Sequence, residues 1–534
     1  MLRLNYKCEI MNSLKKITGI LVMGFVVTSC DDILDTIPTD RVSTEIFWRT
    51  DQDAQFAANA VYTHIIQSAS HYASWDGMTD IGYTNLPQSP ESFILKGEFD
   101  QLNSRVASDW RSLYAGIRSA NAFLNNVDRV NTNNAALIER LKAEVKVLRA
   151  YFYAQLAFLY GDVPLVTTEI SLEESKTLTR NPVSQVWDFV SNELTEAAAV
   201  LPTTQADKGR VTKGTALGLK ARYMLYAGRY QEAADAADAV MDLGVHDLFP
   251  SYENLFKYAN ENNEEVLFDI QYVQGTVSND IFGVFAQRSV NGRSLFVPTK
   301  NLVDAYEMTN GLPIDDPGSG YDPANPYVDR DPRLRYSVYV EGDILPNGNT
   351  FDPKPNSGTG DAVGSTFLVS PTGFNVKKYI NVEDLATPNN SGINLILLRY
   401  AEVLLTYAEA KIELNQIDNT VYDAINEVRS RLDVNMPAIA DGKSQEELRE
   451  IVRRERLVEL AFEGQRFYDI RRWRIAGDVM PGKVYGMTYT DTEGELQTVE
   501  VTAWTNVWSD RNYLWPIPQG ELDLNASLGQ NPNW

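Results

Sequence analysis

The stretch RRERLVELAFEGQRFYDIRRW, from Arg453 to Trp473, places four acidic and six basic side chains among large apolar ones. Upstream of it, Ser444 and Glu447 form a capping-box pattern, which predicts a helix that runs from there to Gly464. At about 100° per residue, the apolar side chains of this segment gather on one face of the helix. We therefore expect this face to pack against the rest of the chain, together with the charges that lie within it.

Glutamates interrupt the apolar face. Glu455 and Glu459 fall in its middle, and Glu463 continues the same i, i+4 row. Like charges in one row repel each other, and an unpaired buried carboxylate costs free energy. The row therefore needs cationic partners. We predict them among the arginines that follow the break at Gly464 and can fold back for bidentate pairing: Arg466, Arg471 and Arg472.

A catalytic alternative would make two of these glutamates an acid–base pair acting on a glycosidic bond. Such a pair needs one raised carboxyl pKa and an open cleft. Dense arginine instead lowers the pKa of neighbouring carboxyl groups. We interpret the row as a structural ion cluster. Elsewhere the sequence contains no recognisable nucleophile–base set and no phosphate-binding loop, so we predict no catalytic residue and no enzyme activity.

The composition excludes several classes of function. The 534 residues carry a net charge of -24, which argues against nucleic acid as a partner, because phosphate binding requires clustered Lys and Arg. The two cysteines, Cys8 and Cys30, both lie within the first 30 residues, and the three histidines form no HExxH pattern. We expect no disulfide in the folded body, no metal site and no cofactor.

The segment MNSLKKITGILVMGFVVTSCDD, which begins at Met11, is typical of an export signal. Two lysines precede a mostly apolar run from Ile17 to Val27, which is too short to span a bilayer. The run ends at VTSC, which resembles a bacterial lipobox and makes Cys30 the predicted lipidation site. Residues 1–29 are then the signal peptide, with translation starting at Met1 or Met11. The alternative is a buried N-terminal helix with an unmodified cysteine.

Helical patterns fill two parts of the body, residues 105–245 and 393–475. Within the first part, KGTALGLKARYMLYAGRYQEAADAADAVMDLG resembles a tetratricopeptide unit, in which small residues let paired helices approach closely. Between the two parts, residues 266–385 are rich in Gly, Pro, Asn and Asp, and alternating stretches such as VLFDIQYV predict strands. We predict a mainly α fold over residues 30–534: a tetratricopeptide-like helical scaffold with a long irregular insertion of loops and short strands.

Several motifs together resemble the SusD/RagB family of outer-membrane lipoproteins. They are ERLVELAFEGQRFYDIRRW, WRSLYAGIRSANAFL, LRAYFYAQLAFLYGDVPLV, NLILLRYAEVLLTYAEA and LWPIPQGELDLNASLGQNPNW. The resemblance extends from Cys30 to Trp534 and departs at QNPNW, where the family commonly has Gly after the Pro. It implies a SusD-like helical fold and a non-catalytic protein, lipid-anchored in the outer membrane and facing the cell exterior. Such a protein captures glycans or other nutrients for a SusC-like TonB-dependent transporter.

A sugar site needs exposed aromatic rings and a few directed polar groups, carried on loops. Two segments have this composition, SHYASWDGMTDIGYTNLPQ and QGTVSNDIFGVFAQRSVNGRSLF, and they broadly match the regions where the resemblance places ligand aromatics. For each ring, the alternative is packing within the protein. The predicted ligand-binding residues are Trp75, Tyr72, Tyr83, Asp76 and Asn85 in the first segment, Phe282, Phe285 and Phe296 near Asn279 and Arg288 in the second, and Tyr321 in a third loop.

Four functions remain compatible with the sequence. The first, which we predict, is a cell-surface lipoprotein that binds a glycan and delivers it to the transporter. The second is a surface binder of peptides or another non-sugar nutrient, as in the RagB branch, with the same transporter. The third is a glycan-active enzyme, and the fourth is an interaction scaffold that uses its tetratricopeptide-like helices.

Overall fold

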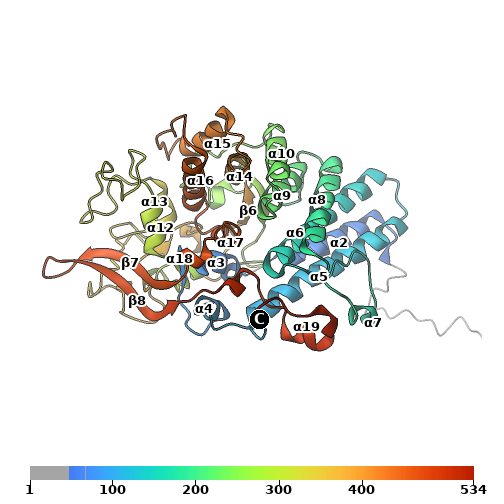
Figure 1. Ribbon diagram of the computed structural model, residues 1–534, viewed down its shortest axis with the longest axis horizontal. Helices are drawn as coiled ribbons and strands as arrows, with labels where there is room; N and C mark the ends of the chain where they lie inside the picture. Colours follow the sequence, from blue (N-terminus) through green and yellow to red (C-terminus); the bar gives the residue numbers. More distant parts are fainter. Residues whose placement is uncertain (1–46, 67) are drawn as a thin grey trace, which may run out of the picture. The chain divides into compact units, whose positions relative to one another are not determined.

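The computed structural model describes residues 47–66 and 68–534 (Figure 1). The predicted signal peptide and the lipidation site Cys30 lie outside these residues. Trp48–Trp534 form one compact unit. Within the described part of the chain, none of the helices has both the length and the apolar character that crossing a membrane requires.

Long helices dominate this unit, as predicted for a mainly α fold. Each contacts the next along the chain, from α5 through α6, α8 and α9 to α10, and α10 packs on α14. The two helical parts predicted from the sequence therefore lie side by side (Figure 1). The long helices are α2 (Asp51–Tyr62), α5 (Ser104–Asn126), α6 (Ala135–Tyr160), α8 (Val183–Val200), α9 (Lys213–Tyr226), α10 (Tyr230–Met241), α14 (Tyr400–Glu413), α15 (Asn419–Arg429) and α16 (Gln445–Glu459).

Glycine sets the close approach of α5 and α6. A Cβ atom at Gly116 in α5 would lie 2.5 Å from the ring of Phe152 in α6, so no larger residue fits without moving one helix. The same helix α6 ends at Gly161, whose φ of 73° lies in the left-handed region that favours glycine. Gly161 therefore stops the helix.

Short elements fill the rest of the unit. The short helices are α3 (Ala69–Gly77), α4 (Pro90–Leu95), α7 (Leu172–Ser175), α11 (Ile281–Phe285), α12 (Lys300–Ala305), α13 (Arg333–Ser337), α17 (Arg466–Arg472), α18 (Ala476–Val479) and α19 (Gln519–Leu524). The strands are β1 (Gly82–Thr84), β2 (Val266–Ile270), β3 (Phe296–Pro298), β4 (Val338–Tyr339), β5 (Asn375–Val376), β6 (Leu395–Arg399), β7 (Gly482–Thr490) and β8 (Leu496–Asn506). They form antiparallel pairs: β1 with β3, β2 with β6, β4 with β5, and β7 with β8.

The irregular insertion contributes much of the apolar core. Buried side chains from 281–306, 334–351 and 374–380 pack together with Val458, near the end of α16, and with Phe462, which comes after that helix. The first five residues of the stretch VLFDIQYV form β2, as the sequence predicts for a strand there, and β2 pairs with β6 through an irregular register around Phe268. This pairing fixes the segment Asp269–Tyr272, which lines the site described below.

The glutamate row Glu455, Glu459 and Glu463 is buried within an ion network. The capping box at Ser444 and Glu447 is present, but the helix ends at Glu459, earlier than predicted. Every carboxylate of the row is paired with cations. Glu455 pairs with Arg333 and Arg429, Glu459 with Arg333, Arg399 and Arg431, and Glu463 with Arg399 and Lys378.

The predicted cationic partners of this row are wrong. Arg466 pairs with Asp80, 2.8 Å away, and Arg472 pairs with Glu409 and Asp469. Arg471 is buried, has no carboxylate partner within the described residues, and stacks on the ring of Phe467, so burial lowers its pKa to about 9. The reason is the chain turn after α16: Phe462 and Gly464 have positive φ values of 58° and 81°. This turn directs α17 away from the glutamate row.

Candidate functional site

The predicted aromatic platform does not exist as an exposed surface. Trp75 lies in α3, not in a loop, and is only 8% exposed. Its ring stacks on Trp515, with centroids 5.9 Å apart, and packs edge-on against Phe467 at 4.8 Å. The expectation of an open ring at this position is therefore wrong, because the polar-looking loop is a helix capped by Ser68 and packed on the C-terminal segment.

The other predicted aromatic rings are buried or half-buried. The Tyr72 hydroxyl donates to the carbonyl of Ile396 at 3.0 Å and lies within the core. The Tyr321 ring is half-buried and lies 5.4 Å from the Arg330 guanidinium. Buried rings offer no face on which a sugar can stack. The further rings that are buried, contrary to the expected exposure, are Tyr83, Phe282, Phe285 and Phe296.

The predicted polar residues hold the backbone. Asp76 is buried, and its carboxylate accepts hydrogen bonds from the backbone N–H groups of Gly464 at 2.8 Å and Arg466 at 3.1 Å. Burial raises the pKa of Asp76 to about 7. Asn85 donates its side-chain amide to the carbonyl of Val369. Both residues therefore connect distant segments in this structure.

Two neighbouring hollows on another part of the surface are the candidate site. The first has a volume of about 290 Å³ and the second about 550 Å³, within the range of small-molecule sites. They share Ile66, and consecutive residues from Asp269 to Tyr272 line one or the other. The first hollow is lined by Asn59, Tyr62, Thr63, Ile65, Ile66, 207–210 and 269–271.

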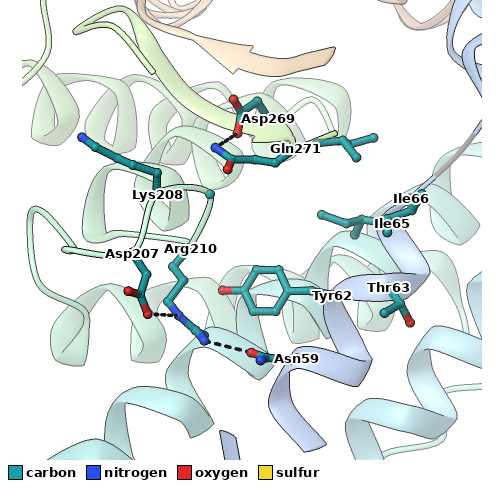
Figure 2. Close-up of a pocket in the computed structure, with 12 residues that line it drawn as sticks. Asn59, Tyr62, Thr63, Ile65, Ile66, Asp207, Lys208, Arg210, Asp269 and Gln271 are labelled. Carbon is teal, nitrogen blue, oxygen red and sulfur yellow. Dashed lines mark hydrogen bonds and ion pairs between the residues drawn. The ribbon is translucent and has the colours of Figure 1, made fainter. Parts of the chain in front are cut away.

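Tyr62, at the end of α2, supplies the aromatic ring of the first hollow. Its hydroxyl donates to the buried carboxylate of Glu144 at 3.0 Å and accepts from the backbone N–H of Val211 at 3.1 Å. Burial and the nearby Glu144 raise the pKa of this hydroxyl well above its ordinary value. Figure 2 shows the ring between Arg210 on one side and Ile65 and Ile66 on the other. The hydrogen bonds fix the ring in this orientation.

Polar side chains face this ring from two segments. Arg210 pairs with Glu144 at 2.8 Å and with Asp207 at 3.2 Å, and donates to Asn59 at 2.8 Å. Opposite, Asp269 at the end of β2 is 5% exposed. Its carboxylate accepts from the side-chain amide of Gln271 at 3.4 Å (Figure 2). It also accepts from the side-chain amide of Asn394 at 3.2 Å. Burial raises the pKa of Asp269 to about 6.

The second hollow continues along the segment that follows β2. A narrow turn lies there, with the bridged pair Val273 and Val277 both exposed at its base. The turn is held by hydrogen bonds from Gln274 to Thr387 and from the backbone of Gly275 to Asn390. The lining residues are Ile66, Ser68, Tyr272, Ser278, Asn279, Asp280, Arg293 and Asn389.

The residues predicted from the sequence overlap the second hollow and do not include the first. The second predicted segment, residues 274–296, does contribute to the second hollow, through Asn279 and Arg293 among others. The sequence analysis did not identify the first hollow, because Tyr62 lies in the last turn of a segment with the pattern of an ordinary amphipathic helix. A signal that could have found it is the apolar pair Ile65 and Ile66, which the sequence places shortly before the polar residue Ser68.

The combined lining suits binding of a ligand with both apolar faces and polar edges. An aromatic ring and aliphatic side chains supply apolar surface, and amides and carboxylates supply directed hydrogen bonds. Within the described residues, no group of three or more His, Cys, Asp or Glu side chains is arranged to hold a metal ion.

Comparisons with known protein families match most of the chain. The family described as "SusD family" matches residues 253–534, and the one described as "Starch-binding associating with outer membrane" matches residues 43–225. A SusD-like protein of Formosa agariphila, named P2, is 26% identical over 97% of this chain and 98% of its own length. A SusD-like protein of Bacteroides ovatus is 25% identical over 86% of this chain and 82% of its own.

Solved structures show the same fold. A SusD-like carbohydrate-binding protein from Bacteroides fragilis superimposes with a TM-score of 0.83 at 30% identity, covering 90% of this chain and 100% of that one. A laminarin-binding SusD-like protein superimposes with a TM-score of 0.71 at 21% identity, covering 91% and 100%. The helical architecture predicted from the sequence is confirmed by these likenesses.

Proposed function

Since this chain belongs to the SusD family, we propose that it is a non-catalytic surface lipoprotein that binds a glycan in the two hollows around Ile66. It delivers that glycan to a SusC-like TonB-dependent transporter. The family is one of carbohydrate-binding proteins and is described as associating with the outer membrane. The B. fragilis relative, at 30% identity, is itself described as carbohydrate-binding, which supports a glycan as the ligand.

The observation that carries this proposal is the lining of the two hollows. A sugar ring has weakly polar C–H faces and a rim of hydroxyl groups. Tyr62 and Ile66 offer surface for the faces, and Gln271 and Asp269 lie where they can bond the rim. Most of the rings predicted from the sequence are buried, and Tyr321, which is half-buried, lines neither hollow. We therefore place the ligand at the hollows and not at Trp75.

Replacing Ile66 with Ser tests the location of the site. Ile66 is 42% exposed and borders both hollows, so its loss should remove apolar contact without unfolding the protein. We expect the dissociation constant of a bound glycan to rise about tenfold, corresponding to about 1.4 kcal/mol. Calorimetric titration with a polysaccharide chosen from a soluble panel, including laminarin and soluble starch, measures the change.

Ile344→Ser is the matched control for that experiment. Ile344 is 62% exposed and lines neither hollow. Its substitution should leave the dissociation constant unchanged. Equal binding by the two variants and the unaltered protein would place the ligand elsewhere.

The anchor is tested at Cys30, which lies outside the described residues. The VTSC pattern before it motivates the prediction. Cys30→Ala should prevent lipid attachment, so that the protein stays unprocessed or is released from the membrane fraction. Membrane fractionation and surface labelling of intact cells measure this. Unchanged surface labelling of the variant would refute the anchor at Cys30.

A further inference from the structure

The two arginines that line the hollows are paired with protein carboxylates. In the first hollow, Arg210 uses its three guanidinium nitrogens on Glu144, Asp207 and Asn59. In the second hollow, Arg293 pairs with Asp280 at 2.5 Å and donates to the carbonyl of Gly283. Each of these two arginines therefore already has a carboxylate partner within the protein.

Lys208 is the remaining cation of the lining. It is exposed and has no ion pair within the described residues. Figure 2 shows its ammonium group pointing away from Tyr62 and Ile65. An exposed lysine of this kind adds little to affinity, because water and salt screen its charge.

Asp269 has the opposite character. It is nearly buried, lines the first hollow, and receives hydrogen bonds from the side-chain amides of Gln271 and Asn394, with no cation beside it among the described residues. A carboxylate only accepts hydrogen bonds when ionised, so it attracts hydroxyl donors. It repels a second anion in the same hollow, and this repulsion is strong where water is excluded.

The whole protein reinforces this local preference. Its net charge of -24 produces a negative potential that disfavours the approach of polyanions. An acidic glycan would need a local cluster of free cations to overcome that field. Among the lining residues that the structure describes, Lys208 is the one cation without an ion pair, so the hollows contain no such cluster.

We infer that the glycan bound at these hollows is uncharged, and that Asp269 selects against glycans bearing carboxylate or sulfate groups. This inference rests on the proposed function. It adds a substrate class and assigns a specificity role to one residue. Asp269 accepts a sugar hydroxyl, and the same charge excludes acidic polymers.

The test compares matched neutral and acidic polysaccharides. The probes are a panel of neutral glycans (laminarin, soluble starch, dextran and methyl-esterified galacturonan) and the corresponding anionic forms (sulfated laminarin, dextran sulfate and free-acid galacturonan). We expect binding to members of the neutral panel only. Their dissociation constants should change by less than about twofold between 50 and 500 mM NaCl, because no ion pair with the ligand is screened. Tight, salt-sensitive binding of an anionic form in preference to its neutral counterpart would overturn the inference.

The substitution Asp269→Asn removes the negative charge of this side chain but nearly preserves its shape, so it tests the role of the charge alone. Burial already raises the pKa of Asp269 to about 6, so a neutral amide at this position should be tolerated by the fold. We expect the dissociation constant for the neutral glycan to rise about tenfold, the size of one charge-assisted hydrogen bond. The affinity for the anionic form should increase. This opposite movement of the two ligands is not expected from a merely structural residue.

Asp238→Asn is the control, because Asp238 is exposed on α10 and lines neither hollow. It should change neither affinity. Parallel losses for both ligands in Asp269→Asn would contradict the selective role. Binding of peptides with no glycan of either charge class would instead refute the proposed function itself, an outcome distinct from binding of an anionic glycan.

Discussion

Glu459→Gln is expected to lower the free energy of unfolding by roughly 3–5 kcal/mol, the usual result of removing one partner from a buried ion pair. Glu459 is fully buried at the end of α16. Its carboxylate lies 2.7 Å from Arg399 and 2.9 Å from each of Arg333 and Arg431. Those arginines come from separate segments of the chain. The uncharged glutamine would therefore weaken the ion pairs that connect all three segments to α16.

The pH dependence of this effect has a definite sign. Burial by itself would raise the pKa of Glu459, but Arg431, Arg399 and Arg333 outweigh it and hold the pKa far below its usual range. A depressed carboxyl pKa contributes stability that is present above the unfolded value of about 4.5 and is lost as pH falls toward the folded value. The difference between the variant and the unaltered protein should therefore narrow below about pH 4.5.

Chemical denaturation at pH 7 and at lower pH measures both effects. Glu450→Gln is the matched control, since Glu450 is exposed on the same helix. We expect a change within about 0.5 kcal/mol for it. Glycan binding per folded molecule should survive in Glu459→Gln. Unchanged stability combined with lost binding would contradict the structural role.

Trp75→Ala should also destabilise the fold, by about 3–5 kcal/mol, as for other large-to-small substitutions of buried aromatics. The ring contacts three separate parts of the chain. It stacks on Trp515, packs against Phe467, and lies 4.5 Å from the guanidinium of Arg105. Removing it would leave a cavity between α3, α5 and α17.

Phe56→Ala provides the comparison, because Phe56 is also aromatic but is 55% exposed on α2. Its loss should change stability much less. Melting curves and denaturant titrations compare the two variants, and a calorimetric titration checks the binding of the folded fraction. If the Trp75→Ala protein kept full stability but no longer bound glycan, the ring of Trp75 would be part of the ligand site after all.

The sequence predicted the elements whose causes are local. The capping box at Ser444 and Glu447 depends on a few neighbouring residues and was placed correctly. The helical fold class follows from the spacing of apolar residues, which is likewise a local pattern in the sequence. The cost of burying Glu455 and Glu459 likewise showed that cations must lie near them.

Partner identity and exposure depend on segments far apart in the sequence. Arg333 and Arg399 reach Glu459 from 126 and 60 residues away, and no local pattern specifies that pairing. Trp75 and Tyr62 show that local sequence patterns also fail to predict which residues are exposed at the site. The first lies in an apparently polar segment but is covered by Trp515, and the second ends an ordinary helix but borders a hollow.

The sequence by itself therefore determined the fold class, the family and the kind of residue that a buried glutamate row requires. Tertiary structure alone decided which arginines pair with that row and which rings face solvent. The physical reason is that periodicity and capping act over a few residues, whereas burial is a property of surfaces brought together by folding. An aromatic residue in a polar stretch can therefore lie in the core, as Trp75 does, while Ile66 stays exposed at the candidate site.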